Sequence, residues 1–163
     1  MFFYLQGKNK YNYNILLKRG LRMDKFIVET QYVKDDIECV TILNIPMGIR
    51  CGYIGVGDNS PLYGKNEEDL PLSAHGGITY TSHFPPRTFE SIQKGRNLYW
   101  IGFDTGHFGD RLDDETIQKY NITNGVCTFW STEGTYIASK ENVDAEVELL
   151  RLQAIQAKNE DDK

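Results

Sequence analysis

Cysteine is scarce in this chain, whose 163 residues include only three cysteines, Cys39, Cys51 and Cys127. No two of them have the CxxC spacing that is typical of metal-binding and redox motifs. An odd number of cysteines also fits a reducing compartment better than a disulfide framework. We therefore expect a cytoplasmic protein without structural disulfides.

Long apolar runs are missing as well. No stretch approaches the roughly eighteen apolar residues that a membrane-spanning helix needs. The start, Met1-Phe2-Phe3-Tyr4-Leu5, lacks the charged segment, the long apolar core and the cleavage site of an export signal. We expect neither export nor a membrane partner.

Basic residues are fewer than acidic residues in this chain. Lysine and arginine number 18 against 23 acidic residues, which gives a formal net charge of −5, and the basic residues cluster only at Lys18-Arg19-Gly20-Leu21-Arg22. A DNA or RNA polymer is therefore not an expected partner, because such binding depends on a basic surface. A small anionic ligand remains compatible, since backbone N–H groups, a few arginines or a bound cation can offset an acidic average locally.

The length predicts one folded domain. Residues 1–22 are polar and low in complexity, and we expect an extension that is flexible or not native, with Met23 as a candidate translation start. Residues 23–158 are expected to form a single α+β domain, and residues 159–163 a solvated tail.

Alternating apolar and β-branched residues predict strands over 26–33, 38–44 and 49–57, which form a meander, and over 75–81 and 97–103. Residues 139–158 predict a helix, since Val143, Val147, Leu150 and Ala154 recur at helical spacing. We expect a mostly antiparallel, twisted sheet of about five or six strands with the C-terminal helix packed on one face. One helix covers a broad sheet only in part, so a homo-oligomer is an expected partner arrangement.

The densest group of chemically active residues follows the strand at 97–103. In Trp100-Ile101-Gly102-Phe103-Asp104-Thr105-Gly106-His107-Phe108-Gly109-Asp110, two aspartates flank a histidine on a glycine-rich loop. His75 begins a second strand, and neighbouring strands would bring these side chains together. Carboxylates and imidazoles that converge suit a divalent cation such as Mn²⁺ or Zn²⁺, or an acid/base pair.

We assign catalytic roles to His75, His107 and Asp104, and metal ligation to Asp104, His107 and Asp110. Ligand contacts are assigned to Asp110, Thr79, Tyr53 and Tyr63, because tyrosines can stack on a nucleotide base. A structural interpretation stays open beside each role: the aspartates can cap turns, His107 can be a satisfied buried histidine, and the tyrosines can be core residues. His83, in a proline-rich loop, is interpreted as a surface histidine.

Four segments carry a resemblance to a known family. Cys51-Gly52-Tyr53-Ile54-Gly55-Val56, Pro61-Leu62-Tyr63-Gly64, His75-Gly76-Gly77-Ile78-Thr79-Tyr80 and the 101–110 motif, followed by a C-terminal helix, resemble small, largely uncharacterised bacteriophage and prophage proteins over about residues 25–157. The family commonly has Gly-His-Pro where this chain has Asn59-Ser60-Pro61, and a cysteine where it has Thr105. Neither a histidine at 60 nor a thiol at 105 is therefore required here.

The resemblance implies a phage protein in a bacterial host cell, where small accessory proteins often counter host defence. By this analogy, we expect a small nucleotide-like ligand, such as a host immune signal, bound in a His/Asp pocket. Two outcomes stay open: the pocket sequesters this ligand, or it hydrolyses the ligand with the help of a metal, as a phosphodiesterase does. The alternative is a non-catalytic inhibitor that binds a host protein through a surface patch.

Overall fold

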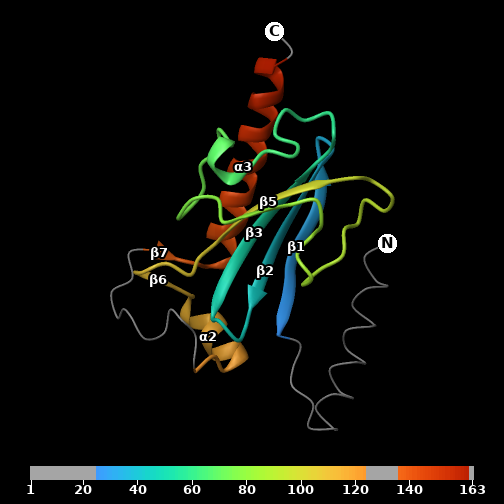
Figure 1. Ribbon diagram of the computed structural model, residues 1–163. Coiled ribbons are helices and arrows are strands. Elements are labelled where there is room, and N and C mark those ends of the chain that lie inside the picture. Colours follow the sequence, from blue (N-terminus) through green and yellow to red (C-terminus); the bar gives the residue numbers. More distant parts are fainter. Residues whose placement is uncertain (1–24, 124–135, 162–163) are drawn as a thin grey trace.

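The computed structural model describes residues 25–123 and 136–161 and has an antiparallel five-stranded sheet at its centre (Figure 1). The strand order is β1-β2-β3-β5-β4. These strands are β1 (Phe26–Lys34), β2 (Ile37–Asn44), β3 (Ile49–Val56), β4 (Tyr80–Ser82) and β5 (Tyr99–Asp104). With helix α3 (Lys140–Asp161) packed on the sheet, the predicted α+β class is confirmed.

The first three strands form the predicted meander. β1 and β2 are joined by the two-residue turn Asp35-Asp36, in which both residues have positive φ, 48° and 66°. Two left-handed residues define the hairpin turn whose twist matches that of the strands, and aspartate tolerates this conformation better than most side chains. β2 and β3 pair from Asn44↔Ile49 onward, across a turn in which Gly48 has φ of 64°.

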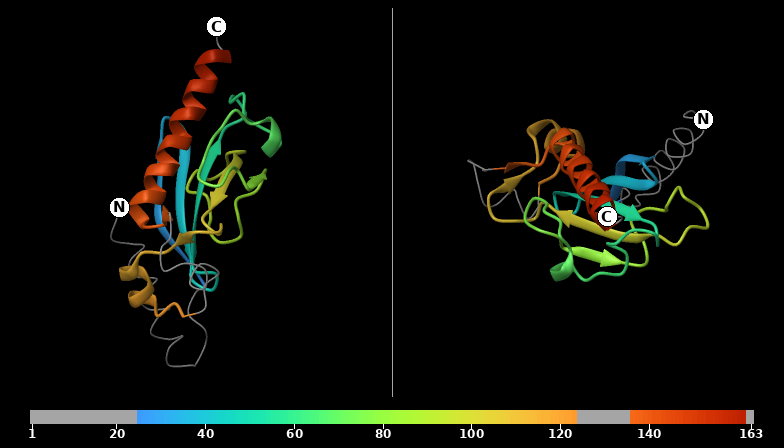
Figure 2. Two further views of the ribbon diagram at one scale, coloured as in Figure 1. Left: turned by 90° about the vertical axis from the view of Figure 1, so that its left-hand side faces the viewer. Right: turned by 90° about the horizontal axis from the view of Figure 1, so that it is seen from above.

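Helix α3 lies along one face of the sheet, as the two views of Figure 2 show. Its buried apolar residues, Val143, Val147, Leu150 and Ala154, are those that the helical spacing predicted. Gly52 of β3 lets the helix approach closely, because a Cβ there would lie 2.5 Å from a methyl group of Val147. The helix runs to Asp161, so residues 159–161, predicted as part of a tail, are instead its last turn.

The opposite face of the sheet is covered by the segment between β4 and β5. Phe89 and Leu98 of this segment pack on the buried side chains of Val40, Ile42 and Trp100. The fully buried Glu38 anchors the segment, since its carboxylate accepts hydrogen bonds from Ser91 Oγ at 2.7 Å and from Ile92 N at 3.0 Å. Both faces of the central strands are thereby covered, whereas Phe26, Val28 and Val33 of the edge strand β1 are exposed.

A short parallel pair, β6 (Asp110–Arg111) and β7 (Tyr136–Ile137), and helix α2 (Asp114–Tyr120) lie beyond the end of β5, and a 3₁₀ turn, η1 (Glu67–Asp69), lies in the loop after β3. The acidic stretch at 113–115 caps α2: the Asp113 carboxylate accepts from Thr116 N at 2.8 Å, and acidic side chains fill the first turn. Residues 1–22 and the apolar run at 126–130 lie outside the described residues. In the described part of the chain, no helix combines the length and the apolar character required to span a bilayer.

Candidate functional site

The site lies where β4 and β5, neighbours in the sheet, meet the segments that flank them. The predicted strand at 75–81 begins later than expected, because Gly77 N donates to Ala74 O at 2.9 Å and closes a turn with His75 and Gly76 at its corner. β4 starts only at Tyr80. The turn nevertheless stays beside the end of β5, since Thr79 N donates to Gly102 O at 2.9 Å.

Gly76 brings the two motifs into direct contact. Its φ of 69° lies in the left-handed region that favours glycine. A Cβ on this residue would lie 2.0 Å from Cε1 of His107, so the imidazole occupies the space of the missing side chain. The His-Gly-Gly sequence and the histidine of the second motif are therefore complementary parts of one structure.

Asp110 is at the centre of this structure. Its carboxylate is 3% exposed and contacts both histidines: Oδ1 lies 2.8 Å from His75 Nε2, and Oδ2 lies 3.1 Å from His107 Nδ1. The backbone N–H of His107 also donates to Oδ2, at 3.1 Å. We call His75, His107 and Asp110 the His/Asp cluster. In residues 25–123 and 136–161, it is the one group of three or more metal-ligating side chains whose ligand atoms lie within 4.8 Å of one another.

Tyr136 fixes the orientation of His75. The two rings stack with 3.8 Å between their centroids and an interplanar angle of 16°. Burial, with weaker coulombic contributions from Glu146 and Asp110, raises the pKa of Tyr136 to about 12, so its hydroxyl is neutral at physiological pH. Because Tyr136 pairs with Asp110 in the parallel β6–β7 ladder, the residue that stacks on His75 is tied to the carboxylate that His75 contacts.

The cluster is open to solvent on its histidine side. The side chains of His75 and His107 are 22% and 35% exposed, while Asp110 forms the buried base. A buried carboxylate between two accessible imidazoles can hold a transition-metal ion, or can orient both rings for proton transfer. The structure thus brings together three of the four residues from which we expected a site.

Asp104, the fourth, is engaged elsewhere and lies outside the metal-ligating group. Its Oδ1 accepts from Gly106 N at 2.8 Å, and its Oδ2 accepts from Thr79 Oγ1 at 2.9 Å. These bonds match the turn-capping interpretation and join β5 to the segment before β4. The catalytic role of Asp104 and the ligand contact of Thr79 stay predictions.

Tyr53, Tyr63 and His83 lie in other aromatic groups. Tyr53 packs edge-on against Tyr80 at 5.6 Å between ring centroids, on the sheet face away from α3. Tyr63 contacts His83 and Tyr99, at 5.3 and 5.7 Å. The core interpretation therefore describes both tyrosines, and their ligand contacts stay predictions.

Sequence reasoning missed two parts of the site. Tyr136 follows no recognisable motif, and its strand β7 is only two residues long. Gly76 was also given no role from the sequence, although the space left by its missing side chain is filled by the imidazole of His107. The adjacent glycines Gly76 and Gly77 after His75 were the signal in the sequence that could have indicated this close approach.

Comparison with protein-family models, with curated proteins and with solved structures finds no match for this chain.

Proposed function

We propose that this protein is a metal-dependent hydrolase that binds one divalent transition-metal ion at the His/Asp cluster. The observation that carries this proposal is the convergence of two imidazoles and a buried carboxylate, with ligand atoms within 4.8 Å of one another. Metal–ligand bonds of about 2.0–2.2 Å place the ligands of one ion roughly 3–3.5 Å apart. Small side-chain rotations in the cluster supply that spacing.

The ligand types favour zinc or manganese. Imidazole nitrogen suits transition metals, whereas magnesium and calcium prefer oxygen-only sites. Three protein ligands would leave a coordination position for water, and the partial exposure of both histidines supports access of solvent to it. A zinc ion held by these residues would lower the pKa of a water ligand to about 7 and would so supply hydroxide for hydrolysis.

The hydrogen bonds of the His/Asp cluster also support an alternative mechanism, in which the protein is a hydrolase that works without a metal. With each imidazole donating one N–H to Asp110, Nδ1 of His75 and Nε2 of His107 keep their lone pairs. Either nitrogen can then act as a general base, oriented by the buried carboxylate. Metal binding competes with this arrangement, because a cation takes the place of a shared proton.

For the substrate we propose a small nucleotide-like molecule, in keeping with the phage-protein resemblance and a counter-defence role. The acidic net charge of −5 supports a small ligand over a nucleic-acid polymer. Phe108, next to His107, is 85% exposed and offers an aromatic surface at the edge of the cluster. Aromatic surfaces of this kind stack on bases of any identity.

The chain contains its own control for a metal-binding experiment. Of its three histidines, two belong to the cluster, and His83 contacts Tyr63 and Tyr99 instead. Zinc and manganese titrations by calorimetry, in two buffers of different ionisation enthalpy, measure both affinity and proton release. We expect His75→Ala and His107→Ala to weaken metal binding by more than the about 10–100-fold that is typical for loss of a residue hydrogen-bonded to a metal ligand, and His83→Ala to leave it unchanged.

Turnover is measured by phosphorus NMR on a panel of linear and cyclic nucleotides, with and without added metal. Cleavage that needs metal and is lost in Asp110→Asn supports the hydrolase. Cleavage that persists in chelator supports the metal-free acid/base site. Equal metal affinity in all three histidine variants, with no nucleotide bound or cleaved, would refute the proposal and leave the non-catalytic inhibitor as the function to test.

A further inference from the structure

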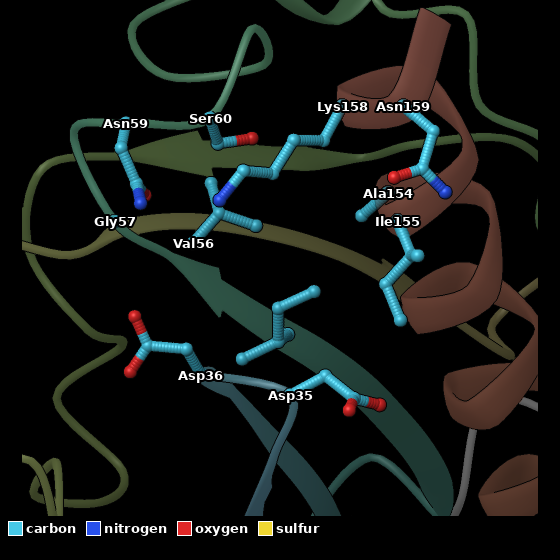
Figure 3. Close-up of a pocket in the computed structure, with 11 residues that line it drawn as sticks. Asp35, Asp36, Val56, Gly57, Asn59, Ser60, Ala154, Ile155, Lys158 and Asn159 are labelled. Atoms are coloured by element: carbon cyan, nitrogen blue, oxygen red, sulfur yellow. The ribbon is translucent and has the colours of Figure 1, made fainter. Parts of the chain in front are cut away.

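A second site lies at the opposite end of β3 from the His/Asp cluster. A cavity of about 390 Å³ opens between the β1–β2 turn, the end of β3 with the residues that follow it, and the last turns of α3 (Figure 3). This volume is within the range of about 300–1,000 Å³ that is usual for small-molecule pockets. The register of β3 places it far from the cluster, since Cys51, near the start of the strand, pairs with Asp104.

One wall of the cavity is apolar. Ile37 of β2, Val56 of β3, and Ala154 and Ile155 of α3 line it. Three of these side chains are also part of the core, with exposures of 8% for Ile37, 1% for Val56 and 2% for Ala154. A ligand on this wall would therefore contact mainly the half-buried Ile155, with the other three side chains as its packed base.

Lys158 supplies the charge. Its side chain extends from α3 across the cavity toward Val56 and Ser60 (Figure 3). Among the ion pairs of the described residues, none includes Lys158. Asn59, Ser60 and Asn159 add neutral hydrogen-bonding groups around it.

The two carboxylates of the cavity are already neutralised. Asp35 is paired with Arg151, and Asp36 with Arg96. Hydrogen bonds from Arg96 hold the pKa of Asp36 below its ordinary value, with Lys158 as a weaker contributor. The guanidinium of Arg96 also borders the cavity, because a Cβ at Gly57 would lie 2.8 Å from its Nη2. Of the charged side chains that line the cavity in the described part of the chain, only Lys158 is outside these ion pairs.

We propose that this cavity binds a small amphipathic monoanion, a carboxylate with a short apolar body. The carboxylate would pair with Lys158 and the neighbouring amides, and the apolar body would lie on Ile37, Val56 and Ile155. One ammonium without an ion-pair partner matches one negative charge, which favours a carboxylate over a phosphate dianion. The site is independent of the proposed hydrolase function, and either can fail without the other.

Octanoate is a suitable probe, with acetate and octyltrimethylammonium as controls for the apolar body and for the charge. The measurement is a titration of ¹⁵N-labelled full-length protein followed by amide chemical shifts. We expect octanoate to shift the amides of Gly57, Asn59 and Ser60, and acetate and the cation to bind far more weakly.

Variants test the role of the lysine. Lys158→Gln should weaken octanoate binding about tenfold, as expected for one charge-assisted contact, and Lys158→Arg should restore most of it. Lys119→Gln, on α2, makes the same change in net charge away from the cavity and should have no effect. Because Lys158 is exposed, these variants should fold normally. Equal binding of the anionic and cationic probes, an unchanged affinity in Lys158→Gln, or no octanoate binding would overturn the proposal.

Discussion

Replacing Gly76 with alanine should separate backbone strain from the packing that builds the His/Asp cluster. The new methyl group would lie 2.0 Å from Cε1, 2.4 Å from Nε2 and 2.5 Å from Nδ1 of His107, so the imidazole must move. Movement of the ring breaks its 3.1 Å contact with the buried carboxylate of Asp110. The variant thus disturbs the cluster without removing any of its functional groups.

The expected loss in the free energy of unfolding of Gly76→Ala is the sum of two contributions. Alanine in the left-handed region costs about 1–2 kcal/mol wherever it occurs. Loss of one partner by a buried carboxylate adds about 1–3 kcal/mol. Gly64→Ala isolates the first contribution, because Gly64 has a similar φ, 75° against 69°, and a Cβ there would meet nothing within 4 Å. We expect the free energy of unfolding to fall by about 1–2 kcal/mol in Gly64→Ala and by about 2–5 kcal/mol in Gly76→Ala.

Urea unfolding measures both values, and the imidazole resonances of His107 report the position of the ring. Gly77→Ala is a second control in the same turn, since its φ is 92° and the space around it is open. If Gly76→Ala and Gly64→Ala lose the same stability and the His107 resonances do not change, the inferred packing is wrong. If the proposed metal site is correct, zinc affinity should fall about 10–100-fold in Gly76→Ala and remain unchanged in Gly64→Ala.

Three further predictions concern other parts of the fold. A hydrogen bond from Arg151 lowers the pKa of Glu148 to about 2. The ionised Glu148 therefore stabilises the fold fully above its unfolded pKa of about 4.3, and this stabilisation is lost as the pH falls toward 2. Between about pH 4.3 and pH 2, the urea midpoint of Glu148→Gln should depend less on pH than that of the wild type. Asp113→Ala should lower the free energy of unfolding by more than the about 1–2 kcal/mol that a helix cap contributes, because it also removes the 2.8 Å ion pair with the buried Arg50; Asp113→Asn, which can still cap α2, should lose less, as thermal unfolding would show. Burial raises the pKa of the Cys39 thiol to about 11, so a disulfide reagent at pH 8 should label this fully buried position only after unfolding, as peptide mass spectrometry would reveal.

Much of the fold could be predicted because its signals are local. The alternating residues of β1 to β3 and the apolar spacing of α3 each lie within one continuous segment, and both patterns reflect burial on one face. The predicted start of β4 was wrong, because the true start depends on a turn at His75-Gly76 that apolar alternation does not encode. The short strands β6 and β7 pair across a gap of 24 residues in sequence, and no pattern of two residues can specify such a partner.

The site could be predicted in composition but not in geometry. The spacing of His107 and Asp110 by three residues on one loop made their contact foreseeable, whereas His75 lies 35 residues from Asp110 and depended on the strand order. The sequence could not show that the oxygens of Asp104 are used by Thr79 and Gly106. Carboxylates that cap turns and carboxylates that ligate metals have the same local sequence preferences, and only their partners distinguish them.

The β1–β2 turn has a consequence for the order of folding. Adjacent residues of this turn hold layers on opposite sides of the sheet: Asp35 pairs with Arg151 of α3, 116 residues away, and Asp36 pairs with Arg96 of the segment between β4 and β5, 60 residues away. A hairpin forms from local contacts, before the entropy cost of closing long loops is met. We expect the hairpin to form first and to provide two separate docking points. Helix α3 docks through Asp35, and the segment between β4 and β5 docks through Asp36. A single added residue in the turn should release one of them while the other remains attached.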